Sequence, residues 1–294
     1  MRMRTVIVLA LIAVPASSCG GGSGHTGGTL DVVAAENVYG DIAAQIGGSH
    51  VSVTSILTSP NSDPHLFEPG TANGLAVAGA RVVLENGLGY DAFMRKLADA
   101  APDSGRVVVT MADVLGVQGK DANPHLWYDV PALGRIARAI GAALERADPR
   151  HASAYRAGVS RFDRSLGPLR REVATIRARF HDAPVAYTEP VPGYLVAAAG
   201  LNNLAPDSFT RPIEDGSEPP PSGLAAMAEL IAHHRIRVLL YNAQTVSPTT
   251  ARLRDAARAA GIPVVPVRET LPAGATFQRW QLEQARALAA ALRR

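Results

Sequence analysis

The chain has 294 residues, of which 47% are hydrophobic and 19% are charged. This balance argues against disorder and allows a sizeable core, which at this length we expect to be divided between two domains. The formal charge of +3 includes Arg2 and Arg4, and without these two residues it falls to +1. Since no basic run alternates with aromatic residues either, the composition argues against a nucleic-acid-binding protein.

The N-terminal residues have the pattern of a secretory signal. Arg2 and Arg4 precede an apolar run over residues 6–14, and small residues follow it. The run is too short for an ordinary transmembrane helix, whereas a basic start, a short apolar stretch and small residues are typical of a signal peptide. The sequence therefore predicts a signal peptide over residues 1–18.

Cys19 is the only cysteine of the chain and directly follows this segment. Its position resembles that of the lipidated cysteine in bacterial lipoprotein signals, although Ala16 stands where such signals usually carry Leu. An ordinary signal peptide with an incidental cysteine is the alternative. Residues 19–28 are rich in glycine and are interpreted as the lipidated cysteine with a flexible tether. We therefore expect an extracytoplasmic protein that is anchored to the membrane through Cys19.

Two stretches of the chain, residues 29–147 and residues 182–294, alternate short β-branched runs with helical patterns. Such alternation is typical of βα units around a largely parallel sheet. We expect an N-terminal and a C-terminal α/β lobe. The expected strands are residues 30–34, 51–57, 81–85, 106–110, 184–188, 236–241 and 262–267, and the expected helices are residues 37–46, 71–80, 91–100, 131–147, 222–234, 248–260 and 277–292.

Between the two lobes, residues 148–181 have the pattern of one long helix. Asp148 suits the N-cap and Pro149 the first helical position, and apolar residues recur every three or four positions after them. Gly158, Gly167 and Pro168 are positions where such a helix can bend. The predicted fold class is α/β, with two lobes of parallel sheet joined by one long rigid helix and a metal site at the lobe interface.

The metal site is suggested by a short motif that occurs twice, in which a polar residue and a proline precede a histidine. Proline stiffens the loop that carries the histidine, and the Leu and aromatic residue after it can anchor that loop in a core. A repeated pair of this kind favours a pre-organised metal site, although two unrelated loop histidines are the alternative. The two copies are Asp63-Pro64-His65-Leu66-Phe67 and Asn123-Pro124-His125-Leu126-Trp127.

Two glutamates of the second lobe complete the candidate site. Ligand-binding residues of open α/β sheets lie beyond the carboxyl ends of the strands. His65 and His125 follow strands of the first lobe, and Glu189 and Glu269 follow strands of the second. Two imidazoles and two carboxylates would neutralise a divalent cation. Each glutamate also has an ordinary interpretation, Glu189 as a surface turn residue and Glu269 as a loop cap or a partner of Arg268.

Taken together, several motifs resemble the solute-binding proteins of bacterial zinc and manganese ABC transporters. The resemblance extends over almost the whole chain from Leu30 to Leu292 and implies two lobes bridged by a long helix. The motifs are Ala35-Glu36-Asn37-Val38-Tyr39-Gly40, Asp63-Pro64-His65 with Glu68-Pro69, Glu85-Asn86-Gly87-Leu88-Gly89-Tyr90-Asp91, Asn123-Pro124-His125-Leu126-Trp127 and Tyr187-Thr188-Glu189.

The resemblance also implies the ligands. In this family the histidines of the two motifs bind the metal, which matches His65 and His125, and a late acidic residue matches Glu269. The third ligand is His in typical zinc members and Glu in typical manganese members, and here it is Glu189. The His-rich loop of many zinc members has no counterpart, because residues 116–122 form a short stretch without histidine.

The function implied is capture of one divalent ion, Mn²⁺ or Zn²⁺, and its delivery to a membrane permease, by a monomer that is not an enzyme. The ligand set leans toward manganese because carboxylates are hard donors, but zinc binds most such sites more tightly, and iron is a further possibility. Two alternatives are a surface adhesin with a structural metal and a secreted metal-dependent hydrolase. No H-E-x-x-H or G-x-S-x-G motif supports the hydrolase.

Four further acids are not assigned a role by any motif. They are candidates for contacts around the ligands. These residues are Glu36, Asp113, Asp129 and Glu214.

Overall fold

The computed structural model describes residues 28–59 and 67–294. The first lobe contains a four-stranded sheet in the order β2-β1-β3-β4, in which every pair of neighbouring strands is parallel. The predicted parallel α/β lobe is confirmed. Its strands are β1 (Leu30–Glu36), β2 (Val51–Leu57), β3 (Val82–Glu85) and β4 (Val107–Thr110).

Helices cover both faces of this sheet, which explains why its strands read as nearly continuous apolar runs. Val32 and Ala34 point to the face covered by α1 and α5, whereas Val33 and Ala35 point to the face covered by α2 and α3. These helices and the short α4 are α1 (Asn37–Gly47), α2 (Thr71–Gly79), α3 (Ala92–Ala100), α4 (Met111–Leu115) and α5 (Leu133–Ala147).

The second lobe repeats this topology with the strand order β6-β5-β7-β8, again all parallel. β6 is a two-residue strand at the edge, too short to be recognised from the sequence pattern. The strands are β5 (Pro184–Tyr187), β6 (Asn202–Asn203), β7 (Val238–Asn242) and β8 (Val264–Val267). The helices are α8 (Gly193–Ala198), α9 (Asp207–Glu214), α10 (Pro221–Ala232), α11 (Pro248–Ala259) and α12 (Phe277–Leu292).

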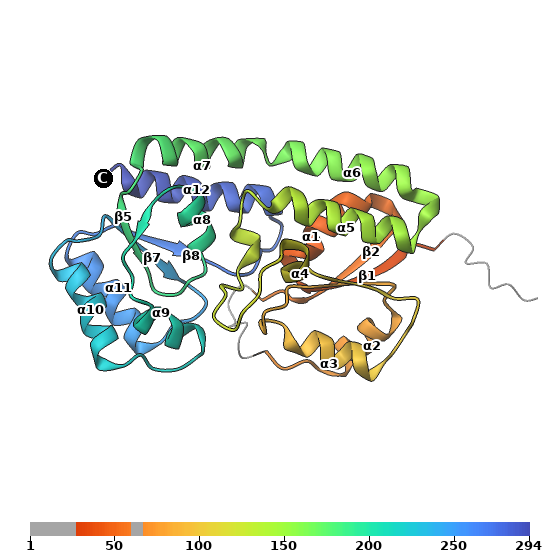
Figure 1. The fold of residues 1–294 in the computed structure, drawn as a ribbon, viewed down its shortest axis with the longest axis horizontal. Helices are drawn as coiled ribbons and strands as arrows, with labels where there is room; N and C mark the ends of the chain where they lie inside the picture. The colour runs from red at the N-terminus through yellow and green to blue at the C-terminus, as the bar shows by residue number, and fades with distance from the viewer. Residues whose placement is uncertain (1–27, 60–66) are drawn as a thin grey trace, which may run out of the picture.

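The expected linking helix consists of two helical segments that run end to end along one side of both lobes (Figure 1). They are α6 (Ala152–Ser165) and α7 (Gly167–Phe180), separated by Leu166. Pro168 explains the interruption because its nitrogen carries no hydrogen to continue the helical ladder. Asp148 stands at the N-cap of a 3₁₀ turn (Pro149–His151) that precedes α6, with Pro149 at its start as expected, but its carboxylate binds the His151 ring and the Tyr155 hydroxyl rather than a backbone N–H.

Close packing ties this helix pair to both lobes. A Cβ atom on Gly158 of α6 would lie 2.1 Å from the Ile46 carbonyl oxygen of α1, so the two backbones touch there. One cluster of buried apolar side chains extends without a break from Val32 in β1 to Leu240 in β7. A continuous apolar contact of this kind opposes large rotations between lobes.

The predicted signal peptide and Cys19 lie outside the described residues. Within the part that the structure describes, no helix is both long and apolar enough to span a bilayer.

Candidate metal centre

The carboxyl ends of the strands in both sheets converge at the lobe interface, and the candidate ligands of the described chain lie there. His125 is fully buried in the segment between β4 and α5, and Glu189 and Glu269 are each 1% exposed after β5 and β8. His65 lies outside the described residues. The strand-end positions identified in the sequence therefore place three of the four predicted side chains in one buried region.

The loop of His125 is held in place by its own motif. The Asn123 side-chain oxygen accepts hydrogen bonds from the His125 backbone N–H at 3.0 Å and faces the ring Nδ1 at 2.8 Å. An amide oxygen can only accept, so Nδ1 carries the hydrogen there. Asn123 is itself fixed by the second lobe, because its amide donates to the Pro190 carbonyl and its carbonyl accepts from the Tyr194 hydroxyl. This arrangement leaves Nε2 of His125 directed at the site.

Carboxylates surround that ring nitrogen. His125 Nε2 lies 3.3 Å from Glu269 Oε2 and 4.0 Å from Glu214 Oε1. Burial by itself lowers the pKa of His125, but the nearby carboxylates of Glu214 and Glu269 outweigh burial and the pKa stands above its usual value. The Tyr90 hydroxyl also donates to Glu269 Oε2 at 2.7 Å.

Amide side chains of the second lobe hold the two buried glutamates. The Asn242 amide nitrogen, at the end of β7, donates to Glu189 Oε2 and, at 2.7 Å, to Glu269 Oε1. Gln244 fixes the Glu269 backbone, because its side-chain oxygen accepts from the N–H groups of Glu269 and Thr270. Buried carboxylates need such donors, since an uncompensated buried charge is very costly.

The candidate ligands within the described residues lie near one another, but they are not arranged around a single point. His125 and Glu269 are in contact, and Glu189 shares the Asn242 amide with Glu269. Across residues 28–59 and 67–294, no three His, Cys, Asp or Glu side chains have the arrangement needed to hold an ion together. Binding an ion would therefore require the ligands to exchange hydrogen bonds for metal bonds.

Sequence reasoning missed several residues of this region. Asn242 and Gln244 follow a strand, as the glutamates do, but a search restricted to His, Asp and Glu passes over amides. Tyr90 lies in a motif that was recognised without a role. Glu214 was named among the unassigned acids that could lie around the ligands, but its place was not predicted, because it ends the unpredicted helix α9 and its 4.0 Å approach to His125 depends on how the two lobes meet.

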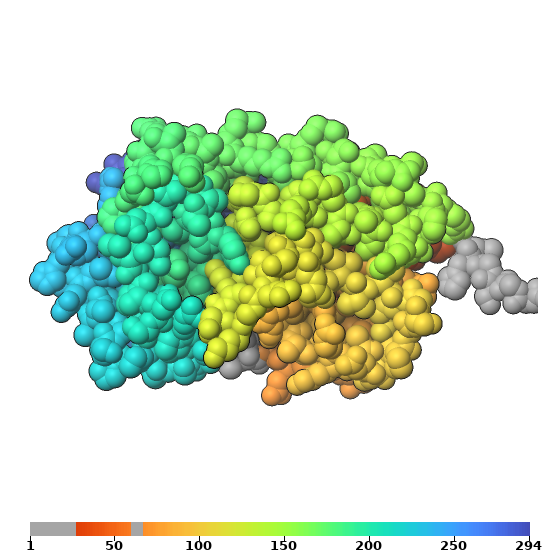
Figure 2. Space-filling view, viewed as in Figure 1, coloured from red at the N-terminus to blue at the C-terminus, as the bar shows by residue number. Residues whose placement is uncertain are grey.

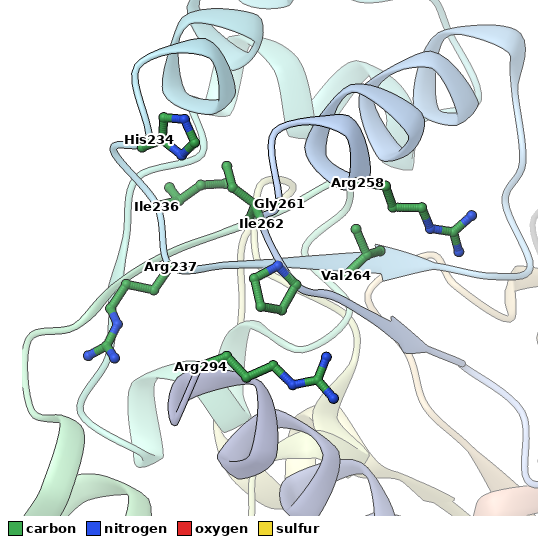
Figure 3. Close-up of a pocket in the computed structure, with 9 residues that line it drawn as sticks. His234, Ile236, Arg237, Arg258, Gly261, Ile262, Val264 and Arg294 are labelled. Carbon is green, nitrogen blue, oxygen red and sulfur yellow. The ribbon is translucent and has the colours of Figure 1, made fainter.

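A different surface hollow, of about 480 Å³, lies at the far end of the second lobe, beside the amino ends of β7 and β8 (Figure 3). Its basic lining consists of Arg237, Arg258 and Arg294, and no Asp or Glu side chain of the described residues lines it. Such a lining would repel a divalent cation. The electrostatics of the described chain thus favour the lobe interface as the cation site.

Two parallel-sheet lobes, bridged by a helix pair and carrying a buried His and Glu site between their carboxyl edges, define a two-lobed α/β solute-binding protein. Residues 32–291 match the family model described as zinc-uptake complex component A, periplasmic. The chain belongs to this family of metal-transport solute-binding proteins, which confirms the resemblance drawn from its motifs.

Known relatives agree with this assignment. The chain is 29% identical over 229 residues to the manganese-binding lipoprotein MntA of Bacillus subtilis, covering 70% of this chain and 72% of the relative. Its fold is similar to the periplasmic zinc-binding protein TroA of Treponema pallidum, with a TM-score of 0.76, 20% identity and coverage of 90% and 99%. It is also similar to a mutant of the laminin-binding adhesin Lmb of Streptococcus agalactiae, with a TM-score of 0.75, 20% identity and the same coverage. At these identities the two structures establish the fold alone.

Proposed function

We propose that this protein captures one divalent transition-metal ion between its lobes and delivers it to the permease of an ABC transporter. The proposed ligands are His65, His125, Glu189 and Glu269. The observation that carries the proposal is the meeting of buried metal-binding side chains from opposite lobes, with His125 Nε2 only 3.3 Å from Glu269 Oε2. The metal is cargo, so the site must both bind it and release it.

The chemistry of the donors supports Mn²⁺ or Zn²⁺ as the cargo. Two neutral imidazoles and two carboxylates balance the charge of a divalent ion in a buried place. Relatives carry both metals in their names, manganese for MntA and zinc for TroA. Zinc prefers four ligands in a tetrahedron, whereas manganese takes more oxygen donors, so the coordination number would decide between them.

Binding should compete with protons. Carboxylates hold the pKa of His125 above its usual value, which favours a charged ring in the absence of an ion. A metal binds only the neutral ring, so the ion must displace the proton on Nε2. Apparent affinity is therefore expected to fall as the pH is lowered through the raised pKa of His125.

The proposal includes the setting of the protein. MntA is named a lipoprotein, and Cys19 follows a signal-like segment. We infer an extracytoplasmic monomer that is anchored through a lipid on Cys19 and that acts as a transport component without enzymatic activity. Absence of labelled lipid on a Cys19→Ala variant, with label present on the natural chain, would support the anchor.

Native mass spectrometry of the metal-stripped protein, offered Mn²⁺ and Zn²⁺ separately, tests the central step. We expect one tightly held ion per chain, lost in His65→Ala and in Glu189→Ala. His50→Ala, which changes a histidine directly before the amino end of β2, is the control and should bind normally. Unchanged binding by Glu189→Ala would show that the ligand assignment is wrong.

A further inference from the structure

Glu214 reaches the ring nitrogen of His125 from a helix that carries none of the proposed ligands. It is the last residue of α9, and Pro212 lies within the same short helix. Its side chain is only 14% exposed, and its Oε1 atom lies 4.0 Å from His125 Nε2. Glu269 faces the same nitrogen at 3.3 Å. Two carboxylates from separate elements therefore converge on one metal-binding atom.

The separation of these atoms is close to that of two ligands sharing an ion. With metal–ligand bonds of about 2.1 Å, two neighbouring donors on one ion lie about 3.0–3.5 Å apart. The 3.3 Å between Glu269 and His125 already falls in this range, and the 4.0 Å of Glu214 exceeds it by less than an ångström. A small adjustment of one glutamate rotamer would bring Glu214 into coordination.

Glu214 also borders a cavity that is lined by residues of both lobes. The cavity has a volume of about 200 Å³, and its lining combines acidic and basic side chains. Figure 2 shows the two lobes in contact on this side, where the yellow-green segment after β4 meets the teal part of the second lobe. The charged lining residues are Lys120, Asp121, Asp207, Arg211, Glu214 and Asp215.

An ion pair across the lobes partly neutralises this lining. Arg211 of α9 lies 3.0 Å from Asp121 of the first lobe and 3.4 Å from Asp207 of its own helix. Glu214 lines the same cavity, and its Oε1 atom also faces His125 Nε2. Its carboxylate therefore lies between the lining of the cavity and the His125 ring.

We propose that Glu214 is an additional metal ligand, supplied by α9 beside His125, Glu189 and Glu269. The inference rests on the proposed function, because it concerns the same ion. A further carboxylate donor raises the coordination number and adds a hard oxygen. Both effects penalise tetrahedral zinc and favour Mn²⁺, so Glu214 is assigned as a determinant of metal selectivity.

The test compares Glu214→Gln with Asp215→Asn, which removes the same charge one residue away from an exposed side chain of the same cavity. Dissociation constants for Mn²⁺ and Zn²⁺ are measured by competition with a chromophoric chelator. Loss of a direct ligand is expected to weaken Mn²⁺ binding by roughly tenfold or more and Zn²⁺ binding by roughly threefold at most. Asp215→Asn should change either affinity by less than about twofold. Equal effects of the two variants would overturn the inference.

Further variants separate this inference from the proposed function. Glu214→Asp keeps the charge but shortens the side chain, and it should also lose Mn²⁺ preferentially; retention of natural Mn²⁺ selectivity by this variant would count against coordination. His125→Ala reports on the site itself. If His125→Ala abolishes binding while Glu214→Gln leaves both affinities unchanged, only the role of Glu214 fails. If His125→Ala binds both metals normally, the proposed function fails first.

Discussion

The two lobes have the same strand order, yet they use equivalent strand ends for different purposes. In each sheet an asparagine stands at the carboxyl end of the third strand along the chain. Asn86 directly follows β3, and Asn242 is the last residue of β7. Asn242 donates to the two buried glutamates of the proposed site. Asn86 instead donates to the Pro124 carbonyl, beside His125, and accepts from the Tyr39 hydroxyl. One lobe restrains ligands directly, and the other positions the loop that carries a ligand.

The buried acids of the two lobes also differ in the hydrogen-bond donors that they receive. Glu189 and Glu269 receive the Asn242 amide, whereas neither carboxylate oxygen of Glu36 at the end of β1 has a hydrogen-bond partner. Burial, with the Asp91 carboxyl nearby, raises the pKa of Glu36 well above its usual value. The comparison teaches that a shared amide donor accompanies the two acids of the proposed site, whereas burial without such a donor raises the pKa of Glu36.

The largest expected effect comes from Asn242→Leu. This change removes the shared donor from two buried carboxylates and should destabilise the metal-free protein by about 3 kcal/mol or more. Saturating Mn²⁺ should restore much of the loss, because the ion replaces the missing positive partner. Urea unfolding with and without metal measures both quantities. Asn202→Ala, at an exposed edge-strand position, is the matched control and should be nearly neutral.

The Asn86→Ala variant tests the difference between the asparagines of the two lobes. It removes hydrogen bonds to Tyr39, Pro124 and Gly87 and should cost about 2–3 kcal/mol of unfolding free energy. Here bound metal should restore little, because Asn86 supports the loop rather than a carboxylate. The same urea experiment applies. Equal rescue of Asn86→Ala and Asn242→Leu by metal would erase the distinction between the lobes.

Glu36→Gln tests whether this buried acid is neutral in the folded state. An acid whose pKa is raised on folding contributes stability that is present below about pH 4.5 and is lost as the pH rises through its folded pKa. The natural chain should therefore lose stability over this range, and Glu36→Gln should lose roughly 1–3 kcal/mol less. Thermal melts from pH 4 to pH 8 supply the comparison, and parallel curves would contradict a raised pKa.

Asp121→Asn gives the smallest expected effect. The Arg211–Asp121 pair joins the lobes, but its side chains are 45% and 64% exposed. Exposed pairs of this kind contribute about 0–1 kcal/mol, less at high salt. The free energy of unfolding measured in urea should therefore change by less than about 1 kcal/mol. A larger loss would mean that the ion pair, rather than the shared apolar core and α6–α7, holds the lobes together.

Much of this organisation could be predicted from the sequence, and the exceptions have physical reasons. The hydrophobic pattern and the positions after the predicted strands were sufficient to predict that His125, Glu189 and Glu269 lie near one another, because parallel strands end at the same edge of a sheet. Of the three positions predicted to bend the linking helix, Gly167 and Pro168 lie at the interruption, whereas Gly158 lies within α6. These features depend on local pattern or on general properties of parallel sheets.

The remaining features depend on contacts between distant segments. Glu214 ends a short helix that contains Pro212, so no periodic pattern marked it. Its approach to His125 arises only when α9 packs against the first lobe. Asn242 acts through two glutamates that are 53 and 27 positions away in the chain. Neither relation leaves a signal in local sequence spacing.

The most direct test of the proposed metal centre is anomalous diffraction from crystals of the manganese-loaded protein, recorded on either side of the manganese absorption edge. We expect one strong anomalous peak at the lobe interface, within bonding distance of His125 Nε2 and of the carboxylates of Glu189 and Glu269. A peak elsewhere on the molecule, or a peak at the interface that none of these three side chains contacts, would contradict capture of the ion between the lobes.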